Sequence, residues 1–363
     1  MKQASIFKWQ QWILPIFIGI GAATAVIWFM AQRTVIDPDT GAEMNSLDLL
    51  FSFEWTRRST WAMMGLIACV VLRDLGYIHR LKTLSFQSFT WRQATQNIFL
   101  WELASALTPS VVGGSAIAVV ILKRDGLRWG KSLATVFATA LLDEAFYLIL
   151  VPIVFGISAV SGHPVFPEWP PDFAGISMGV STIFWIAYSV IAGFTTLMLF
   201  GLIIRPKTTN KFILRASETW ALRRWKDRMK NWASDLLEAS VNIRKAPRNY
   251  WIKGFGATCV SWTARFLTLN MVLLIFYPSL SHAAVFARQL VLWVVLTISP
   301  SPGSSGAAEF GLPLFLSDIT GLAYITGVVI LWRMATYFLY LVLGALVLPQ
   351  WLVRTNSRKK NPS

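Results

Sequence analysis

Six charged residues stand inside runs of apolar sequence long enough to cross a membrane. They are Glu102, Asp143, Glu144, Arg265, Glu309 and Arg333. A charge at the centre of a bilayer costs about 2.5–3.5 kcal/mol even on the insertion scale that gives the lowest values. Each is therefore a candidate for binding a polar ligand, and static ion pairs between helices are the alternative. Because helix neighbours point about 100° apart, Asp143 and Glu144 are expected to face different partners.

Two interruptions of the same type divide the apolar sequence. Both combine prolines, which remove a backbone donor, with glycines, which allow unusual backbone angles. The first contains Thr108, Pro109, Gly113 and Gly114, and the second contains Pro302, Gly303 and Gly306. Irregular backbone at membrane depth survives only where protein covers it or a wet cavity adjoins it. Two broken segments in the two halves of a chain point to a transporter site, and ordinary polar loops are the alternative.

A helix that restarts after a break presents unpaired N–H groups and the positive end of its dipole. Together with Arg265 and Arg333, each of which could also neutralise an acid, these helix starts predict a phosphate-binding centre. Glu309 lies beside the second break, and for this reason we favour a functional role for it. Lys123 and Arg124 are candidates for meeting the phosphate at the inner mouth, although basic residues at span ends more often set topology only.

Composition predicts an all-α integral membrane protein. Of the 363 residues, 55% are hydrophobic and 14% are charged, against about 25% charged in soluble domains, and the mean hydropathy is +0.53. The net charge of +15 could suggest nucleic acid. The basic residues lie between the apolar runs, however, where they set membrane orientation and attract anionic headgroups. We therefore expect no nucleic-acid partner.

Charge bias also predicts the side of each loop. The apolar run 12–30 is long for a cleaved signal segment and is expected to remain as a first helix. The stretch 32–59, with five acids and three arginines, is expected outside. A second span covers about 60–78. Arg73 near its inner end and Arg80 beyond it mark the cytoplasmic side, where both termini are also expected.

The two broken pairs are expected to open from opposite faces. Thr90 and Gln93 have capping-box spacing at the start of the first pair, whose two ends are basic and therefore cytoplasmic. The second pair, about 283–316, begins outside. Each half thus has the order span, broken pair, span, which is typical of an inverted-topology repeat in a polytopic helical bundle.

The segment between the halves is the most basic part of the chain, with thirteen Lys or Arg against four acids over 205–253. An apolar stripe from Leu222 and Trp225 through Trp232 to Leu236 predicts an amphipathic helix on the anionic inner leaflet. A helix packed on the underside of the protein is the alternative. The expected divisions are 1–58, first helix and outside loop; 59–204, first half with its break at 108–115; 205–250, basic linker; 251–350, second half with its break at 299–309; and 351–363, basic tail.

Motifs of nucleotide, metal or nucleophilic chemistry are absent from the sequence. The three histidines lack metal-ligand spacing, and there is no Walker loop, nucleophile elbow or HExxH motif. Cys69 and Cys259 lie within apolar runs, so neither a disulfide framework nor a metal site is expected. We therefore predict no cofactor, no metal and no catalytic residue.

The broken motifs resemble the membrane domain of lysylphosphatidylglycerol synthases and its stand-alone flippase-like relatives. The resemblance covers about 60–350. It rests on Thr108-Pro109, Gly113-Gly114, Lys123-Arg124-Asp125-Gly126, Pro300, Pro302, Gly303, Gly306, Glu309, and Arg333 with Tyr337. The sequence departs from that family at Asp143 and Glu144, near which the family's helix bears an arginine. The resemblance implies lipid translocation, and after Leu348 we expect no room for a headgroup-synthase domain.

The sequence therefore predicts a translocase for a polar-headed, phosphate-bearing phospholipid or glycolipid in a bacterial-type inner membrane. Movement would be downhill, or coupled to protons or another ion through Glu309, Glu102 or Asp143. The alternatives are an enzyme acting on lipid or polyprenyl phosphate, a non-transporting partner of an envelope-lipid synthase, and a small-solute carrier. The sequence leaves open whether the chain forms a homo-oligomer.

Overall fold

The computed structural model describes most of the chain. The described ranges are 20–21, 24–37, 41–108, 110–162, 164–167, 179–219, 226–297, 303–320 and 323–360. Pro109, Pro302, most of the expected first span, and Leu222 and Trp225 of the expected stripe lie outside these ranges. In the part of the first span that is described, residues 24–31 are helical.

The fold is all-α, as predicted. The α-helices are α2 (Ser46–Phe51), α3 (Arg57–Leu84), α4 (Trp91–Leu107), α5 (Ser110–Arg124), α6 (Trp129–Ser161), α7 (Val180–Met198), α8 (Pro206–Ala216), α9 (Lys226–Arg244), α10 (Arg248–Phe276), α11 (His282–Leu296), α12 (Ala307–Thr320), α13 (Ile325–Arg333) and α14 (Leu339–Lys360). Two π-helical turns, η2 (Leu199–Ile204) and η4 (Met334–Phe338), continue α7 and join α13 to α14. The strands β1 (Thr34–Ile36) and β2 (Glu43–Asn45) pair antiparallel, with Val35 opposite Met44.

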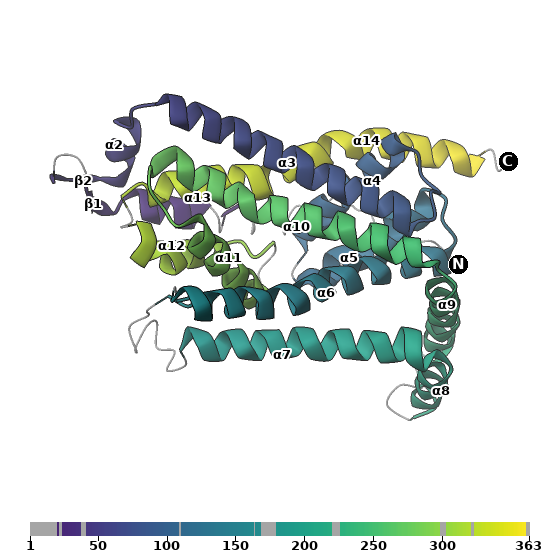
Figure 1. Cartoon of the computed structure of the whole chain (residues 1–363). Coiled ribbons are helices and arrows are strands. Elements are labelled where there is room, and N and C mark those ends of the chain that lie inside the picture. Colours follow the sequence, from purple (N-terminus) through teal and green to yellow (C-terminus); the bar gives the residue numbers. More distant parts are fainter. Residues whose placement is uncertain are drawn as a thin grey trace.

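Five helical segments among the described residues are long and apolar enough to cross a membrane. They are α3, α6, α7 with η2, α10, and the continuous run Ile325–Asn356. The long helices α3 and α10 run side by side through the molecule (Figure 1). A Cβ added at Gly76 of α3 would lie 2.9 Å from Cβ of Ser261 on α10. Glycine therefore permits the close approach of these two helices.

The two short helix pairs lie toward opposite ends of the molecule. Figure 1 shows α4 and α5 toward the end where α9 lies, and α11 and α12 toward the end that holds α2 and the strands. The 17 residues of α4 and the 15 of α5 span about 25 and 22 Å at 1.5 Å per residue, less than the roughly 30 Å of a hydrocarbon core. Symmetry between the two halves stays a prediction.

The capping box predicted at the start of the first pair is confirmed. The Thr90 hydroxyl accepts from the Gln93 backbone N–H, and the Gln93 side chain accepts from Thr90 N. The prediction for the second span is wrong at its inner end, because α3 continues to Leu84. Arg73 and Arg80 are consequently buried inside the bundle, at 1% and 6% exposure, rather than placed at a cytoplasmic helix end.

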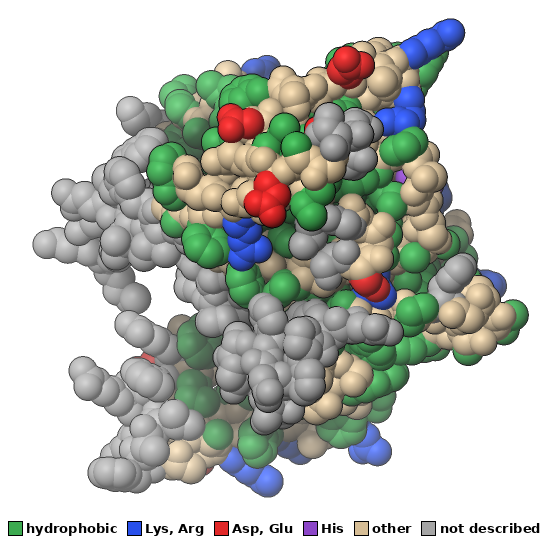
Figure 2. Space-filling view, turned by 90° about the vertical axis from the view of Figure 1, so that its left-hand side faces the viewer, with side chains coloured by type: hydrophobic (Ala, Val, Ile, Leu, Met, Phe, Trp, Pro, Cys, Tyr) green, Lys and Arg blue, Asp and Glu red, His purple; other side chains and the backbone are tan. Residues whose placement is uncertain are grey.

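The end of the molecule that holds the strands carries exposed acids. Glu43, Asp48 and Glu54 are exposed there, and Figure 2 shows separate acidic side chains among hydrophobic and basic ones on this face. The opposite end carries α8, α9 and the C-terminal part of α14 (Figure 1). The charge asymmetry predicted along the chain is thus also an asymmetry between the two ends of the fold.

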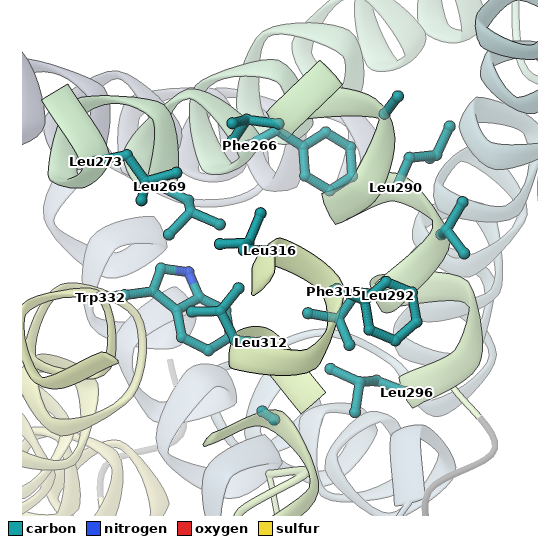
Figure 3. Packing of buried hydrophobic residues seen from close by; sticks show 14 of the residues in the cluster. Phe266, Leu269, Leu273, Leu290, Leu292, Leu296, Leu312, Phe315, Leu316 and Trp332 are labelled. Atoms are coloured by element: carbon teal, nitrogen blue, oxygen red, sulfur yellow. The ribbon is translucent and has the colours of Figure 1, made fainter. Parts of the chain in front are cut away.

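The main hydrophobic core surrounds the second short pair. Figure 3 shows Leu312, Phe315 and Leu316 of α12 lying among side chains of α10, α11 and α13. Leu269, Leu290 and Leu316 are 0% exposed. A pair too short to cross the bilayer is thus covered by protein on several sides, which is the condition under which a broken helix is tolerated in a membrane.

In the basic segment, α9 packs against α6 and η2. Ala233, Ala239 and Ile243 are buried, and Trp232 of the expected stripe is 62% exposed. Of the expected stripe, Leu236 packs against this buried cluster, whereas Trp232 does not belong to it.

Proline at position 152 interrupts the hydrogen bonding of α6. A proline inside a helix removes the bond to the carbonyl four residues earlier, here Leu148. The Tyr188 hydroxyl of α7 donates to that Leu148 oxygen at 3.2 Å. A neighbouring helix thus satisfies the carbonyl that the proline frees.

Candidate functional site

A central cavity of about 260 Å³ lies between the two halves of the chain. Residues of α3, α4, α5, α6, α10, α11, α13, η4 and α14 line it, together with the turn at 303–304. Seven of the predicted site residues are among the lining: Glu102, Thr108, Asp143, Glu144, Arg265, Gly303 and Arg333. Residues far apart in sequence therefore meet at one polar space within the bundle.

Two acids of the cavity are held by arginines of α3. Arg73 Nη2 lies 2.8 Å from Glu102 Oε2. Arg80 pairs with Asp143, which also accepts a hydrogen bond of 2.6 Å from Trp262 Nε1. Both carboxylates thus have a dedicated counter-charge, as buried charges require.

Glu309 and Arg333 form a third pair, and it is the most deeply buried. Arg333 Nε lies 2.7 Å from Glu309 Oε1, and these residues are 4% and 0% exposed. The second carboxylate oxygen accepts from Gly306 N at 2.8 Å. Glu309 therefore accepts the hydrogen bond of the Gly306 N–H at the start of α12, a donor that we expected to bind a ligand. Arg333 lines the cavity, whereas Glu309 lies behind it.

Arg265 has a different environment from these three arginines. It is half-buried, and its Nη1 donates to the Tyr77 hydroxyl at 3.2 Å. Its guanidinium lies 4.4 Å from the ring centroid of Trp293 and 5.2 Å from that of Trp262. No carboxylate of the described residues lies within ion-pair distance of it, although its charge interacts with Glu102. A guanidinium held in this way keeps donors for an anion from the cavity.

Glu144 lines the same cavity. It is half-buried and makes no ion pair with the described residues, in contrast to its neighbour Asp143. The two adjacent acids therefore do not share a partner, in agreement with their expected separation around the helix. The cavity thus presents the guanidinium of Arg265 and the carboxylate of Glu144, and neither forms an ion pair with a described residue.

The π-helical turn η4 follows Arg333 directly. Such turns often occur at functional sites. It places the Tyr337 ring 4.2 Å from the Arg333 guanidinium, and one turn later the Tyr340 hydroxyl donates to Asp74 Oδ1 at 2.7 Å. The Tyr340 ring also lies 4.2 Å from the Arg73 guanidinium. These two tyrosines contact the charges of the site.

The two broken segments meet at this cavity. Gly303 has a left-handed φ of 55°. A Cβ added there would lie 2.7 Å from Tyr337 Cε2 and 3.1 Å from the carbonyl oxygen of Ala106. The turn before α12 therefore rests against the C-terminal end of α4, and only glycine fits both the angle and the space.

Other predicted residues lie outside the cavity lining. Gly113 and Gly114 pack against Thr108 and Ser105 of α4, and Gly306 caps α12. Lys123 lies 4.5 Å from the Trp129 ring, and Arg124 Nη2 donates to Asn356 Oδ1 at 2.6 Å. These two basic side chains contact neighbouring helices, and their meeting a phosphate at the inner mouth stays a prediction.

Sequence reasoning missed the arginines of α3 as site residues. Arg73, Tyr77 and Arg80 follow the spacing i, i+4, i+7 and so share one helix face. This spacing was available as a signal, but hydropathy ended the span too early. Arg80 also supplies, from another helix, the arginine that the sequence lacks beside Asp143.

Comparison with known proteins adds the following. The sequence profile for the transmembrane region of lysylphosphatidylglycerol synthase matches residues 16–344. A protein of Archaeoglobus fulgidus described as a UPF0104 membrane protein is 23% identical over 261 residues, covering 69% of this chain and 74% of that protein. The family match thus extends over both short pairs and the cavity between them.

Proposed function

Because this chain belongs to the family of lysylphosphatidylglycerol synthase transmembrane regions, we propose that it moves a phosphate-bearing lipid from one leaflet to the other. The headgroup occupies the central cavity during the passage. The observation that carries the proposal is Arg265, a guanidinium that faces a cavity at membrane depth without an acidic partner among the described residues. Placing an arginine in that position costs free energy unless its charge binds a partner or a ligand.

The chemistry of Arg265 suits a phosphate. Its planar fork donates two parallel hydrogen bonds to phosphate oxygens, and such charge-assisted bonds are about twice as strong as neutral ones. The rings of Trp262 and Trp293 fix the plane of the guanidinium, which reduces the entropy lost when a ligand binds. Thr108 and Ser304, which also line the cavity, offer hydroxyls to the same headgroup.

The passage itself rests on the two short pairs. Since they approach the cavity from opposite ends of the fold, movement of one and then the other would expose the headgroup to each face in turn. The sequence contains no ATP-binding motif, so we propose movement down a gradient or coupled to an ion. The proposal includes no chemical step.

We also propose an orientation. The end with α8, α9 and the C-terminal part of α14 faces the cytoplasm of a bacterial-type cell, and the end with the strands faces outside. Lys207, Lys211 and Arg215 of α8 are exposed or half-exposed beside the exposed Phe212. This combination suits contact with an anionic inner leaflet.

The test replaces Arg265 in purified protein reconstituted into phosphatidylcholine vesicles with a trace of fluorescent phosphatidylglycerol. Access of a membrane-impermeant quencher reports lipid that has changed leaflet. Loss of hydrogen bonds to a charged group corresponds to about 1.5–3 kcal/mol, so Arg265→Ala is expected to slow translocation about 10- to 100-fold. Arg265→Lys keeps the positive charge but loses the planar fork of donors, so its translocation rate should lie between those of the wild type and Arg265→Ala.

Arg128→Ala is the matched control, because its side chain is 80% exposed and forms a 3.5 Å surface pair with Glu238. It should translocate at the wild-type rate. Equal rates for the wild type, Arg265→Ala and empty vesicles would refute the proposed function. A rapid wild-type rate that Arg265→Ala leaves unchanged would refute the site alone.

A further inference from the structure

An apolar groove lies on the other side of α4 from the central cavity. It has a volume of about 410 Å³ and is lined by α4, α5, α14 and Ile20. Every side chain in its lining is apolar. Val342 and Leu346 on its α14 side are 57% and 65% exposed, so the groove is open laterally, where a membrane would meet it.

Alternating positions of α4 line the two spaces. Leu103 and Leu107 line the groove, whereas Glu102 and Ser105 line the cavity. α4 therefore forms part of the partition between the two spaces, together with α14, whose Tyr340 lines the cavity and whose Leu341 lines the groove.

This partition ends at the break between α4 and α5. Leu107, the last residue of α4, lines the groove, and the next residue, Thr108, lines the cavity. On α5, Ser115 lines the cavity and Ile117 lines the groove. Neighbouring residues line opposite spaces within α4 as well, at Glu102 and Leu103, but only at the tip does this change of side coincide with the end of a helix.

We propose that the groove holds an acyl chain of the lipid whose headgroup lies in the central cavity, with the linkage between them passing around the tip of the α4–α5 pair. This inference rests on the proposed function and names the second part of its binding site. Headgroup and chain of one lipid are covalently joined, so a polar cavity within a membrane must have an apolar path beside it. The cavity wall carries charged side chains among its apolar ones, whereas the groove lining is wholly apolar, so each methylene buried in the groove contributes to binding.

The short length of α4 follows from the same arrangement. A helix that crossed the bilayer completely would separate headgroup and chain along the whole path. A helix that stops at Leu107 leaves a gap at membrane depth. The groove side of α14 also approaches α4 closely: a Cβ added at Gly344 would lie 3.0 Å from Leu103 Cδ2. Small side chains here, including Ala345, leave the groove floor clear.

The experiment fills the groove without touching the cavity. Ala345→Trp places an indole in the groove lining, and Val71→Trp is the control, at a 52% exposed position of α3 that lines neither space. The probe is phosphatidylglycerol with a photoactivatable diazirine near the end of one acyl chain, added in trace amounts to purified protein in detergent. Labelled peptides are then identified by mass spectrometry.

The wild type and Val71→Trp are expected to carry label on α4, α5 and α14 peptides, and Ala345→Trp to lose most of it. In vesicles, Ala345→Trp should slow translocation of long-chain phosphatidylglycerol about tenfold, which corresponds to losing the burial of about two methylene groups. Unchanged labelling in Ala345→Trp would overturn the inference. So would absence of label from these peptides in the wild type, the result expected if the segment before Ile20 filled the groove.

The two proposals fail separately. Labelling of the groove without translocation by the wild type would refute the proposed function and leave the groove as a lipid site. Translocation that depends on Arg265 but is equal in Ala345→Trp and Val71→Trp would refute the groove alone.

Discussion

The buried pair of Glu309 and Arg333 allows one prediction to be worked out from its geometry. Glu309→Gln keeps the shape of the side chain and an oxygen that accepts from Gly306 N–H, but it removes the charge opposite Arg333. Since both residues are nearly inaccessible, at 0% and 4% exposure, solvent does not replace the lost partner. Removing one member of such a pair costs about 3–5 kcal/mol, and the free energy of unfolding should fall by about that amount.

Glu309→Ala separates the two roles of the carboxylate. It removes the charge and also leaves the Gly306 N–H, now bonded at 2.8 Å, without an acceptor. An unsatisfied buried donor costs about 1–3 kcal/mol, so Glu309→Ala should be less stable than Glu309→Gln by that margin. The double variant Glu309→Gln with Arg333→Met removes both charges and should recover much of the loss.

The assay is chemical unfolding in detergent micelles, followed by tryptophan fluorescence. Glu218→Gln is the control, since its 3.9 Å pair with Lys226 is exposed on both sides and its loss should hardly change stability. Equal stability of Glu309→Gln and the wild type would refute the ion-pair argument. Equal stability of Glu309→Ala and Glu309→Gln would refute the capping role.

Two further predictions concern backbone. Tyr188→Phe removes the donor to the Leu148 oxygen freed by the proline of α6 and should destabilise the protein by about 1 kcal/mol; unfolding at the wild-type denaturant concentration would contradict this. Gly303→Ala forces a Cβ into a left-handed position against Tyr337, so it should lower the free energy of unfolding by about 1–3 kcal/mol and slow translocation. Gly256→Ala is the control, because the space around its Cβ is open, and it should be neutral or stabilising. Equal behaviour of the two variants would show that the turn tolerates a side chain.

The general architecture could be predicted from the sequence, because its signals are local. Long apolar runs, a capping box at Thr90 and proline–glycine breaks each depend on a few neighbouring residues. The partners of the buried charges could not be predicted, since they depend on which helices pack together. Arg80 and Asp143 are 63 residues apart, and only the packing of α3 near α6 joins them.

One wrong prediction and one missed contact have identifiable physical causes. Arg73 has the type expected at the inner end of a span, and hydropathy cannot distinguish that position from a buried one when a carboxylate on another helix neutralises it. Glu309 was assigned to a ligand because it follows a break. It stands three residues after Gly306, at the N3 position from which a glutamate caps its own helix, and this spacing was a signal for the intramolecular role.

The contact between Gly303 and Ala106 has a consequence for leakage. A membrane protein with openings to both compartments must never expose them together, or ions would run through it. Here the turn of one broken segment rests on the end of the other, so displacement of either is transmitted to its counterpart through the backbone itself. Under the proposed function, this glycine-sized junction would make access from the two compartments mutually dependent.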